Sequence, residues 1–185
     1  MANDVSTVRG PRSVASPRVS SLSDLAKTIR ANAVVEALGD RRSYACNEAL
    51  LELELSRQPV MENLKDGLTR GVARALAAHD SQVEAVYAYD PSANPDSDAG
   101  DDQPFDAALH LLALVTTPSA ALQAFIAALD RALTESLTEL PSPVFQGRES
   151  VLDITLITRR NVQERRGYAG LLSSRFAPAV EIWRR

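Results

Sequence analysis

One carboxylate lies on each of two apolar segments that have the composition of β-strands. Asp106 is the second residue of the segment Phe105–Val115, and Asp153 lies inside the segment Val151–Thr158. Strands that bring acidic side chains to one edge of a sheet can hold a divalent metal against phosphates. Asp106 and Asp153 are therefore the candidate metal ligands and the candidate catalytic residues. Mg²⁺ is the ion that two such carboxylates would hold, and the sequence establishes no other cofactor.

The elements that would position these residues follow from the hydrophobic pattern. Apolar residues at helical spacing predict helices over residues 21–38, 60–79, 117–140 and 161–173, and the Ala-, Leu- and Glu-rich segment 44–57 favours a helix over a strand. Short apolar runs predict strands over residues 83–89, 105–115, 151–158 and 180–183. The order predicts an α/β (α+β) fold, with a mixed sheet of about four strands and helices packed on it.

Two details of the helices bear on how they begin and how they pack. Thr117 is placed to cap the helix over residues 117–140, with Pro118 at its first position. Gly67 and Gly71 lie on the helix over residues 60–79. Because glycine has no Cβ, these positions predict a close approach by another element.

Length and composition indicate one ordinary globular domain. The chain has 185 residues, of which 45% are hydrophobic, which is enough for a sizeable core. We expect a disordered N-terminal arm at residues 1–20 and a single α/β domain at 21–185, with an acidic loop at 90–104. Cys46 is the only cysteine, which excludes a disulfide within the chain and favours a cytoplasmic location. No apolar run approaches the length that spans a membrane.

Charge is unevenly distributed along the chain. The net charge of −4 gives no strong signal for nucleic acid, but residues 80–147 have eleven acids against Arg131 alone, and residues 148–185 have eight arginines against four acids. The last predicted strand is short and would lie at a sheet edge. These features predict a contact with a second copy of the chain or with a partner protein, through Arg165, Arg166, Trp183 and Arg184.

The order of elements resembles the minimal nucleotidyltransferase fold over about residues 60–185. In that family a first strand leads into a Gly-Ser turn that contacts a phosphate, and carboxylates on the next two strands hold metal ions for attack on a nucleoside triphosphate. The resemblance implies that Ser92 contacts the nucleotide, that Asp106 is the first carboxylate, and that Asp153 is the third. It implies a nucleotide as ligand and a divalent metal as cofactor.

Two positions depart from the pattern of the family. The glycine of the turn is missing and Pro91 removes a backbone N–H from it, while Ala108 stands where the second carboxylate would be. We therefore expect a degenerate nucleotidyltransferase-like protein that binds a nucleotide or a partner without efficient transfer. The alternative is a structural or interaction module that forms oligomers or a complex, and the third interpretation is an active metal-dependent nucleotidyltransferase.

Each candidate residue also has a purely structural interpretation. Asp106 could bond to the preceding turn, and Asp153 could be a half-exposed strand residue that pairs with Arg159 or Arg160. His110, in an apolar strand, has the context of a core histidine whose hydrogen bonds are satisfied. Cys46, in an apolar helix-like stretch, has the context of an inert buried thiol.

Overall fold

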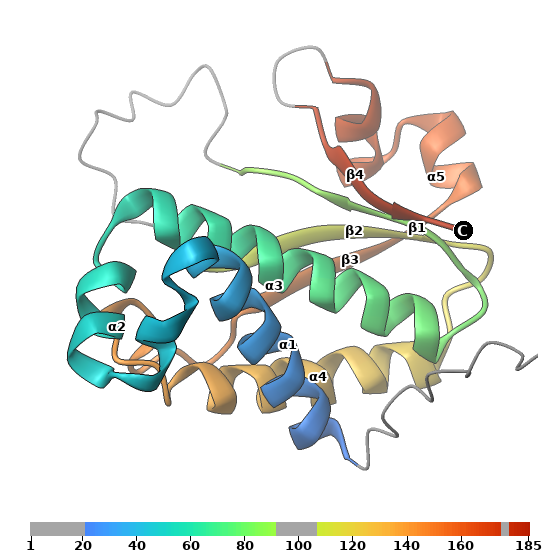
Figure 1. The fold of residues 1–185 in the computed structure, drawn as a ribbon. Helices are drawn as coiled ribbons and strands as arrows, with labels where there is room; N and C mark the ends of the chain where they lie inside the picture. The colour runs from blue at the N-terminus through green and yellow to red at the C-terminus, as the bar shows by residue number, and fades with distance from the viewer. Residues whose placement is uncertain (1–20, 92–106, 175–177) are drawn as a thin grey trace, which may run out of the picture.

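The computed structural model describes residues 21–91, 107–174 and 178–185 and has a mixed α/β fold (Figure 1). Its four strands form one sheet in the order β3-β2-β1-β4. β2 and β3 are parallel, and β1 is antiparallel to both β2 and β4. The strands are β1 (Val83–Ala88), β2 (Leu109–Val115), β3 (Leu152–Thr158) and β4 (Val180–Arg184). The predicted mixed sheet of four strands is confirmed.

The described helices follow the predicted order. Those before the sheet are α1 (Leu22–Leu38), the 3₁₀ helix η1 (Gly39–Cys46), α2 (Glu48–Leu55) and α3 (Gln58–His79). Those between and after the parallel strands are α4 (Ala120–Leu137), η2 (Pro143–Phe145), α5 (Arg159–Glu164) and η3 (Gly167–Ser173). The segment 44–57 is helical, as its composition predicts. No described helix is both long and apolar enough to cross a membrane.

Two helix predictions were wrong in detail. α4 is capped by Ser119, whose hydroxyl accepts from the Leu122 N–H at 3.0 Å, and Thr117 lies outside the helix. Ser119 has the extended backbone of a cap residue, so the chain turns into the helix only after Pro118. The predicted helix over residues 161–173 is divided into α5 and η3, because Arg165 adopts a left-handed backbone with φ 51° and ends α5.

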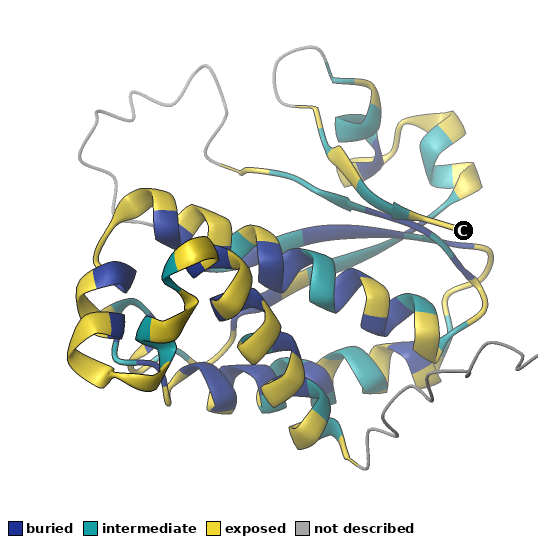
Figure 2. Cartoon of the chain, in the orientation of Figure 1, coloured by how far each residue is buried: buried dark blue, intermediate teal, exposed yellow. Residues whose placement is uncertain are grey.

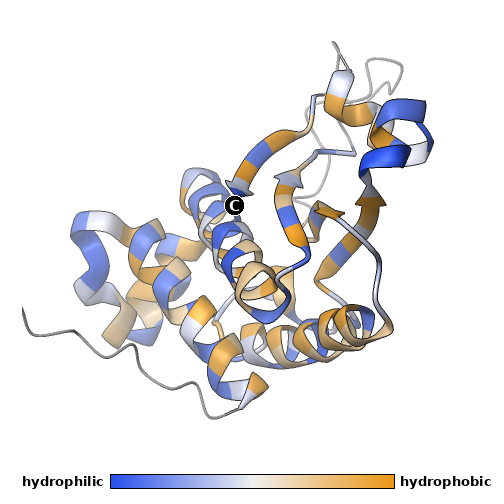
Figure 3. Cartoon of the chain, turned by 90° about the vertical axis from the view of Figure 1, so that its right-hand side faces the viewer, coloured by the Kyte–Doolittle hydropathy of each residue, from blue (hydrophilic) through white to orange (hydrophobic). Residues whose placement is uncertain are grey.

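Helices cover the two faces of the sheet unequally. α1, α3 and α4 lie on one face, and the short α5 and η3 lie on the other (Figure 3). Alternate side chains of β2 point to opposite faces of the sheet. Leu109, Leu111 and Val115 pack in the main core, while Leu112 packs in a smaller cluster with Ile157. β2 is therefore buried on both sides, as its apolar run predicts, and Figure 2 shows its burial between the layers.

α1 and α3 approach closely at two glycines, as predicted. A Cβ built on Gly67 would lie 2.9 Å from the Ala33 Cα, and one on Gly71 would lie 2.7 Å from a methyl carbon of Ile29. Glycine at these positions therefore sets how near the two helices can come, which brings the helical layer together against the sheet.

Candidate functional site

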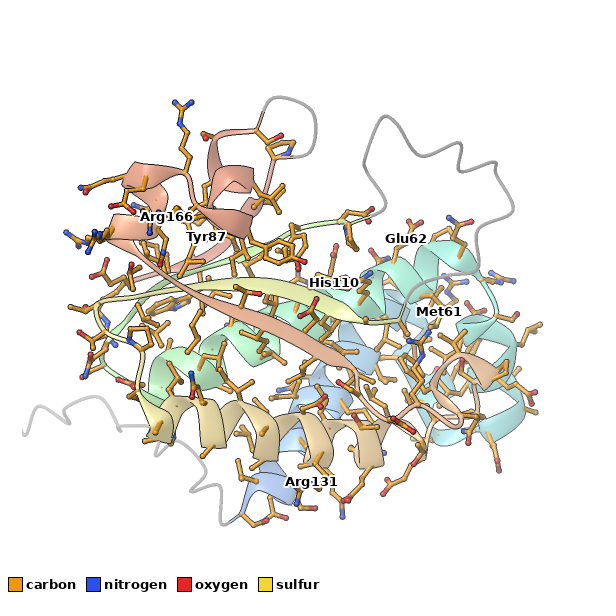
Figure 4. The ribbon with its side chains drawn as sticks, turned by 180° about the vertical axis from the view of Figure 1, so that it is seen from behind. Met61, Glu62, Tyr87, His110, Arg131 and Arg166 are labelled. Atoms are coloured by element: carbon orange, nitrogen blue, oxygen red, sulfur yellow. The ribbon has the colours of Figure 1, made fainter. Side chains whose placement is uncertain are left out.

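The parallel register of β2 and β3 brings a histidine and an aspartate together. His110 and Asp153 are each the second residue of their strand, and the register places them side by side. His110 Nδ1 lies 2.9 Å from Asp153 Oδ2. The His110 side chain is 13% exposed and the Asp153 side chain is 54% exposed. The histidine thus forms the inner part of this pair, and the carboxylate is the more exposed part. His110 is labelled in Figure 4.

A tyrosine completes the group from the neighbouring strand. Tyr89 follows β1 directly, and its backbone N–H donates to the His110 carbonyl at 3.1 Å, which extends the pairing of β1 and β2. Its hydroxyl donates to Asp153 Oδ2 at 3.3 Å, and its ring centroid lies 5.5 Å from that of His110. Tyr168, on η3, lies 5.6 Å from Tyr89, ring centroid to ring centroid. We call Tyr89, His110 and Asp153 the Tyr–His–Asp cluster.

The surroundings of Tyr89 keep its hydroxyl protonated. Burial, followed by the negative charge of Asp153, raises the pKa of Tyr89 from 10.0 to about 12. Tyr89 is therefore a hydrogen-bond donor throughout the neutral range. Asp153 Oδ2 is engaged by both neighbours, whereas Oδ1 has no hydrogen bond to any described residue. The exposed side of the carboxylate is thus the side on which a ligand would bind.

The predicted metal site is only partly within the described residues. Asp153 lies on the sheet as expected, and the strands that follow Asp106 and contain Asp153 are adjacent. Asp106 and Ser92 themselves lie outside the described residues, so their roles stay predictions. Ala108, just before β2, offers a methyl group and no ligand oxygen. Within residues 21–91, 107–174 and 178–185, no three His, Cys, Asp or Glu side chains gather to hold a metal ion. One carboxylate does not make a Mg²⁺ site, so the described residues would need Asp106 to complete one.

The structural interpretation of Asp153 was correct about its half-exposed position and wrong about its partner, since neither Arg159 nor Arg160 pairs with it. Arg159 pairs with Glu84 at 2.8 Å, and Arg160 pairs with Glu164 at 2.8 Å. Asp153 lies near the start of β3 and Arg159 follows its end, so about 20 Å separates them at ~3.3 Å per strand residue. The expectation that His110 has a hydrogen-bond partner was correct, and Asp153 engages its Nδ1.

Sequence reasoning treated His110 and Asp153 separately and did not single out Tyr89. The missed signal was that His110 and Asp153 each lie five residues before the last residue of their predicted strands, which end at Val115 and Thr158. Parallel strands joined by one helix commonly pair in similar register, and equal offsets then place two residues side by side.

The predicted partner-contact residues lie in different settings. Arg165 ends α5, and Arg166 pairs with Glu164 at 2.8 Å. Arg184 pairs with Glu181 and donates to the Tyr87 hydroxyl at 3.0 Å. The half-buried Trp183 packs against the main core. The strand that contains Trp183 and Arg184, β4, lies at the sheet edge, as predicted.

Cys46 was wrongly expected to be buried. Its thiol is exposed, because the chain forms the 3₁₀ helix η1 at this point and no residue of η1 is buried.

A hollow of about 600 Å³ lies at the carboxyl ends of the parallel strands β2 and β3, at the opposite end from His110 and Asp153. Such carboxyl ends are common ligand sites in α/β folds. Here, however, each arginine of the hollow already pairs with a glutamate, and Arg159 holds the pKa of the Glu84 carboxyl below its usual value. The hollow is lined by Glu84, Thr116, Thr117, Thr158, Arg159 and Arg160, together with Pro118. Its charges are thus largely compensated, and the Tyr–His–Asp cluster is the stronger candidate.

Comparison with protein-family models, with curated proteins and with solved structures gives no match for this chain.

Proposed function

We propose that the chain is a degenerate nucleotidyltransferase-like protein that binds a nucleotide at the Tyr–His–Asp cluster and does not transfer it efficiently. The observation that supports this is the half-exposed carboxylate of Asp153, held through Oδ2 beside two aromatic rings, with Oδ1 facing outward. A carboxylate accepts hydrogen bonds from the amino groups of bases, as aspartate does with cytosine N4. Aromatic rings offer stacking surfaces to any base.

Each residue at the cluster would make a different contact with the nucleotide. Tyr89 stays protonated and fixes Asp153 Oδ2, which leaves Oδ1 to accept a hydrogen bond from the ligand. Tyr168, whose exposed fraction is 54%, provides the accessible aromatic surface beside the cluster. If Asp153 and Asp106 bound a Mg²⁺ ion instead, Oδ1 would be a metal ligand and the ion would neutralise phosphate charge. This role for Asp106 follows from the resemblance alone.

Two features argue against efficient transfer. The residue that flanks Asp153 on β2 is His110, an imidazole, and the residue two positions earlier is Ala108. Two-metal catalysis uses several carboxylates to hold the ions that stabilise the attacking and leaving oxygens. The Ala108 and Pro91 positions remove one ligand and one phosphate-binding N–H from the family pattern.

Nucleotide binding can be tested by calorimetric titration with ATP, GTP, CTP and UTP, with and without Mg²⁺. We expect binding of at least one nucleotide. Asp153→Asn should weaken it roughly tenfold or more, since hydrogen bonds to charged groups are worth about 1.5–3 kcal/mol. Glu149→Gln, which neutralises an exposed carboxylate just before β3, is the matched control and should bind like the wild type. Absence of binding to all four nucleotides, or an unchanged affinity in Asp153→Asn, would contradict the proposal.

Transfer can be tested separately with labelled nucleoside triphosphates, Mg²⁺ or Mn²⁺ and candidate acceptors. We expect no appreciable labelling. Robust labelling that disappears in Asp106→Asn would favour the active enzyme instead.

The alternative function, an interaction module, is favoured by the position of β4 at the end of the sheet, beside exposed arginines. Light scattering across a salt series, on the wild type and on a chain with Arg165→Glu and Arg166→Glu, tests this surface. Assembly that weakens with salt and with these substitutions would support it. A monomer under all conditions would exclude self-assembly through these arginines.

A further inference from the structure

β3 lies at the other end of the sheet, and its outer edge is unusually open at its centre. The Leu109 N–H donates to the Val151 carbonyl at 2.8 Å, which shows which alternate residues of β3 direct their backbone groups toward β2. The N–H and C=O groups of residues 151, 153, 155 and 157 therefore point toward β2. Those of residues 152, 154, 156 and 158 point away from the sheet.

Side chains cap the two ends of this edge. The Leu152 N–H donates to Asp130 Oδ1 at 2.9 Å, and the Leu152 carbonyl accepts from the Ser150 hydroxyl at 3.3 Å. At the other end, the Thr158 N–H donates to Asn161 Oδ1 at 2.8 Å. Such caps are one way in which proteins blunt an edge strand.

The centre of the edge has no equivalent cap. The outward N–H and C=O groups of Ile154 and Leu156 have no hydrogen-bond partner within the described part of the chain. Both residues are only partly buried, and no Lys, Arg or Pro interrupts β3. These features mark a strand edge that is open to pairing with another strand.

A groove of about 450 Å³ runs beside this open edge, between β3 and α4. Its α4 side consists of Gln123, Ile126, Ala127 and Asp130, at helical spacing, and its strand side includes Ile154 and Leu156. No basic residue lines it, and Asp130 and Asp153 are its only charged residues. Figure 4 shows β3 and α4 running alongside one another at this side of the molecule. The groove gives apolar side chains of an added strand a place to pack.

We propose that a second copy of this chain pairs with β3, antiparallel, about a two-fold axis at Thr155. In this arrangement Ile154 lies opposite Leu156 of the second copy, and Leu156 lies opposite its Ile154. Each pair exchanges two N–H···O bonds, so the open groups of both edges are satisfied. The open N–H and C=O groups of Ile154 and Leu156 are thus complementary to the same groups of a second copy, and an isologous interface requires such self-complementarity. The two sheets would join into one continuous sheet.

The charges at the two ends of β3 favour the antiparallel arrangement. Asp153 lies near the start of the strand, and Arg159 and Arg160 follow its end. These arginines pair with Glu84 and Glu164, but their side chains stay 76% and 78% exposed and can still face a second copy. Pairing about Thr155 places Asp153 two positions, or about 7 Å along the strand, from Arg159 of the second copy. The two Asp153 side chains would be about 13 Å apart, beyond the ~8 Å screening length of physiological salt. The second copy therefore provides the opposite charge at each end without like charges meeting at the centre.

Disulfide cross-linking tests the axis directly. In the proposed pairing, the two Thr155 residues form a non-hydrogen-bonded pair with Cα atoms about 4.5 Å apart, which lies within the range that a disulfide can bridge. Thr155→Cys in a Cys46→Ser background should form a covalent dimer under mild oxidation. Val180→Cys in the same background places a thiol on the exposed opposite edge and is the matched control. We expect it to stay monomeric.

Sedimentation equilibrium over a wide concentration range measures the association without a cross-link. We expect a monomer–dimer equilibrium in the wild type. Ile154→Lys should raise its dissociation constant roughly 100-fold, since a substitution at a two-fold interface acts twice. Val180→Lys should leave it unchanged, and circular dichroism checks that both variants are folded.

Three results would overturn the proposal. They are a wild-type chain that stays monomeric at all concentrations, cross-linking at residue 180 rather than 155, and a dimer that Ile154→Lys does not weaken.

Discussion

Neutralising Asp153 should lower the pKa of Tyr89 without returning it to its ordinary value. Burial is the largest cause of the raised pKa, and the charge of Asp153 is the second. Asp153→Asn removes the charge and leaves the burial almost unchanged. We therefore expect the pKa of Tyr89 to fall from about 12 toward 10.0 and to stop above it.

The same shift predicts how stability depends on pH. Because the folded state raises the pKa of Tyr89, the unfolded chain loses this proton first as the pH rises. Stability that is fully present below pH 10.0 should therefore fall as the pH approaches 12. A shift of this size corresponds to at most about 2.7 kcal/mol, and since Tyr89 is only half-buried we expect roughly 1–2 kcal/mol. The loss should be smaller in Asp153→Asn.

The assay is a titration of ultraviolet absorbance by the phenolate. The chain has four tyrosines, so the signal of Tyr89 is the difference in absorbance between a protein with Tyr89 and the same protein with Tyr89→Phe. The measurement is made in the wild type and in Asp153→Asn. A Tyr89 that titrates near 10.0 in the wild type, or equally in both backgrounds, would refute the proposed contact between the hydroxyl and the carboxylate.

Three further predictions concern the framework of the fold. Gly67→Ala should lower the free energy of unfolding, measured in urea, by about 1–2 kcal/mol, because the overpacking of the new methyl against the Ala33 backbone outweighs a helix-propensity gain of about 1 kcal/mol. Gly170→Ala is the control and should change it little, because a Cβ there would lie 3.7 Å from the nearest atom, the Arg165 carbonyl oxygen. Asp130→Ala should cost about 1–3 kcal/mol, because the N–H groups of Val151 and Leu152 would lose their acceptor at the start of β3. Asp130→Asn, which keeps an acceptor oxygen, should cost less. The exposed Cys46 should react with a thiol reagent in the folded protein at a rate close to that in urea, and a reaction only after unfolding would show that it is covered.

The elements of this fold could be predicted because each has a distinct local pattern. β2 was recognisable as a central strand from its continuous apolar run, and the helix ends from Ser21, Gly39 and Pro59. The pair of glycines on α3 predicted a close helix contact, and α1 makes it. These patterns are local in the sequence, so they can be recognised without knowing which elements pack against one another.

The contacts of the candidate site could be predicted only in part, because they depend on register. Asp153 was identified as a strand carboxylate, but its partners come from β2 and from the residue after β1. Arg159 was the obvious partner by charge, yet the length of β3 separates the two residues. A pattern of hydrophobic residues shows that a strand exists and does not show which residue of a neighbouring strand lies opposite.

The nucleotide proposal and the dimer proposal both involve β3, but they depend on different atoms of it. Nucleotide binding uses the side chain of Asp153 on the face that α5 and η3 cover only in part. Dimerisation uses the backbone groups of Ile154 and Leu156 on the outer edge, with their side chains on the α4 face. Asp153→Asn should therefore weaken nucleotide binding strongly and the dimer only slightly, through the lost attraction to Arg159 of the second copy. Ile154→Lys should weaken the dimer and leave nucleotide binding. If both variants lost both properties, the two sites would be coupled through β3, and neither loss could be assigned to the contact that was removed.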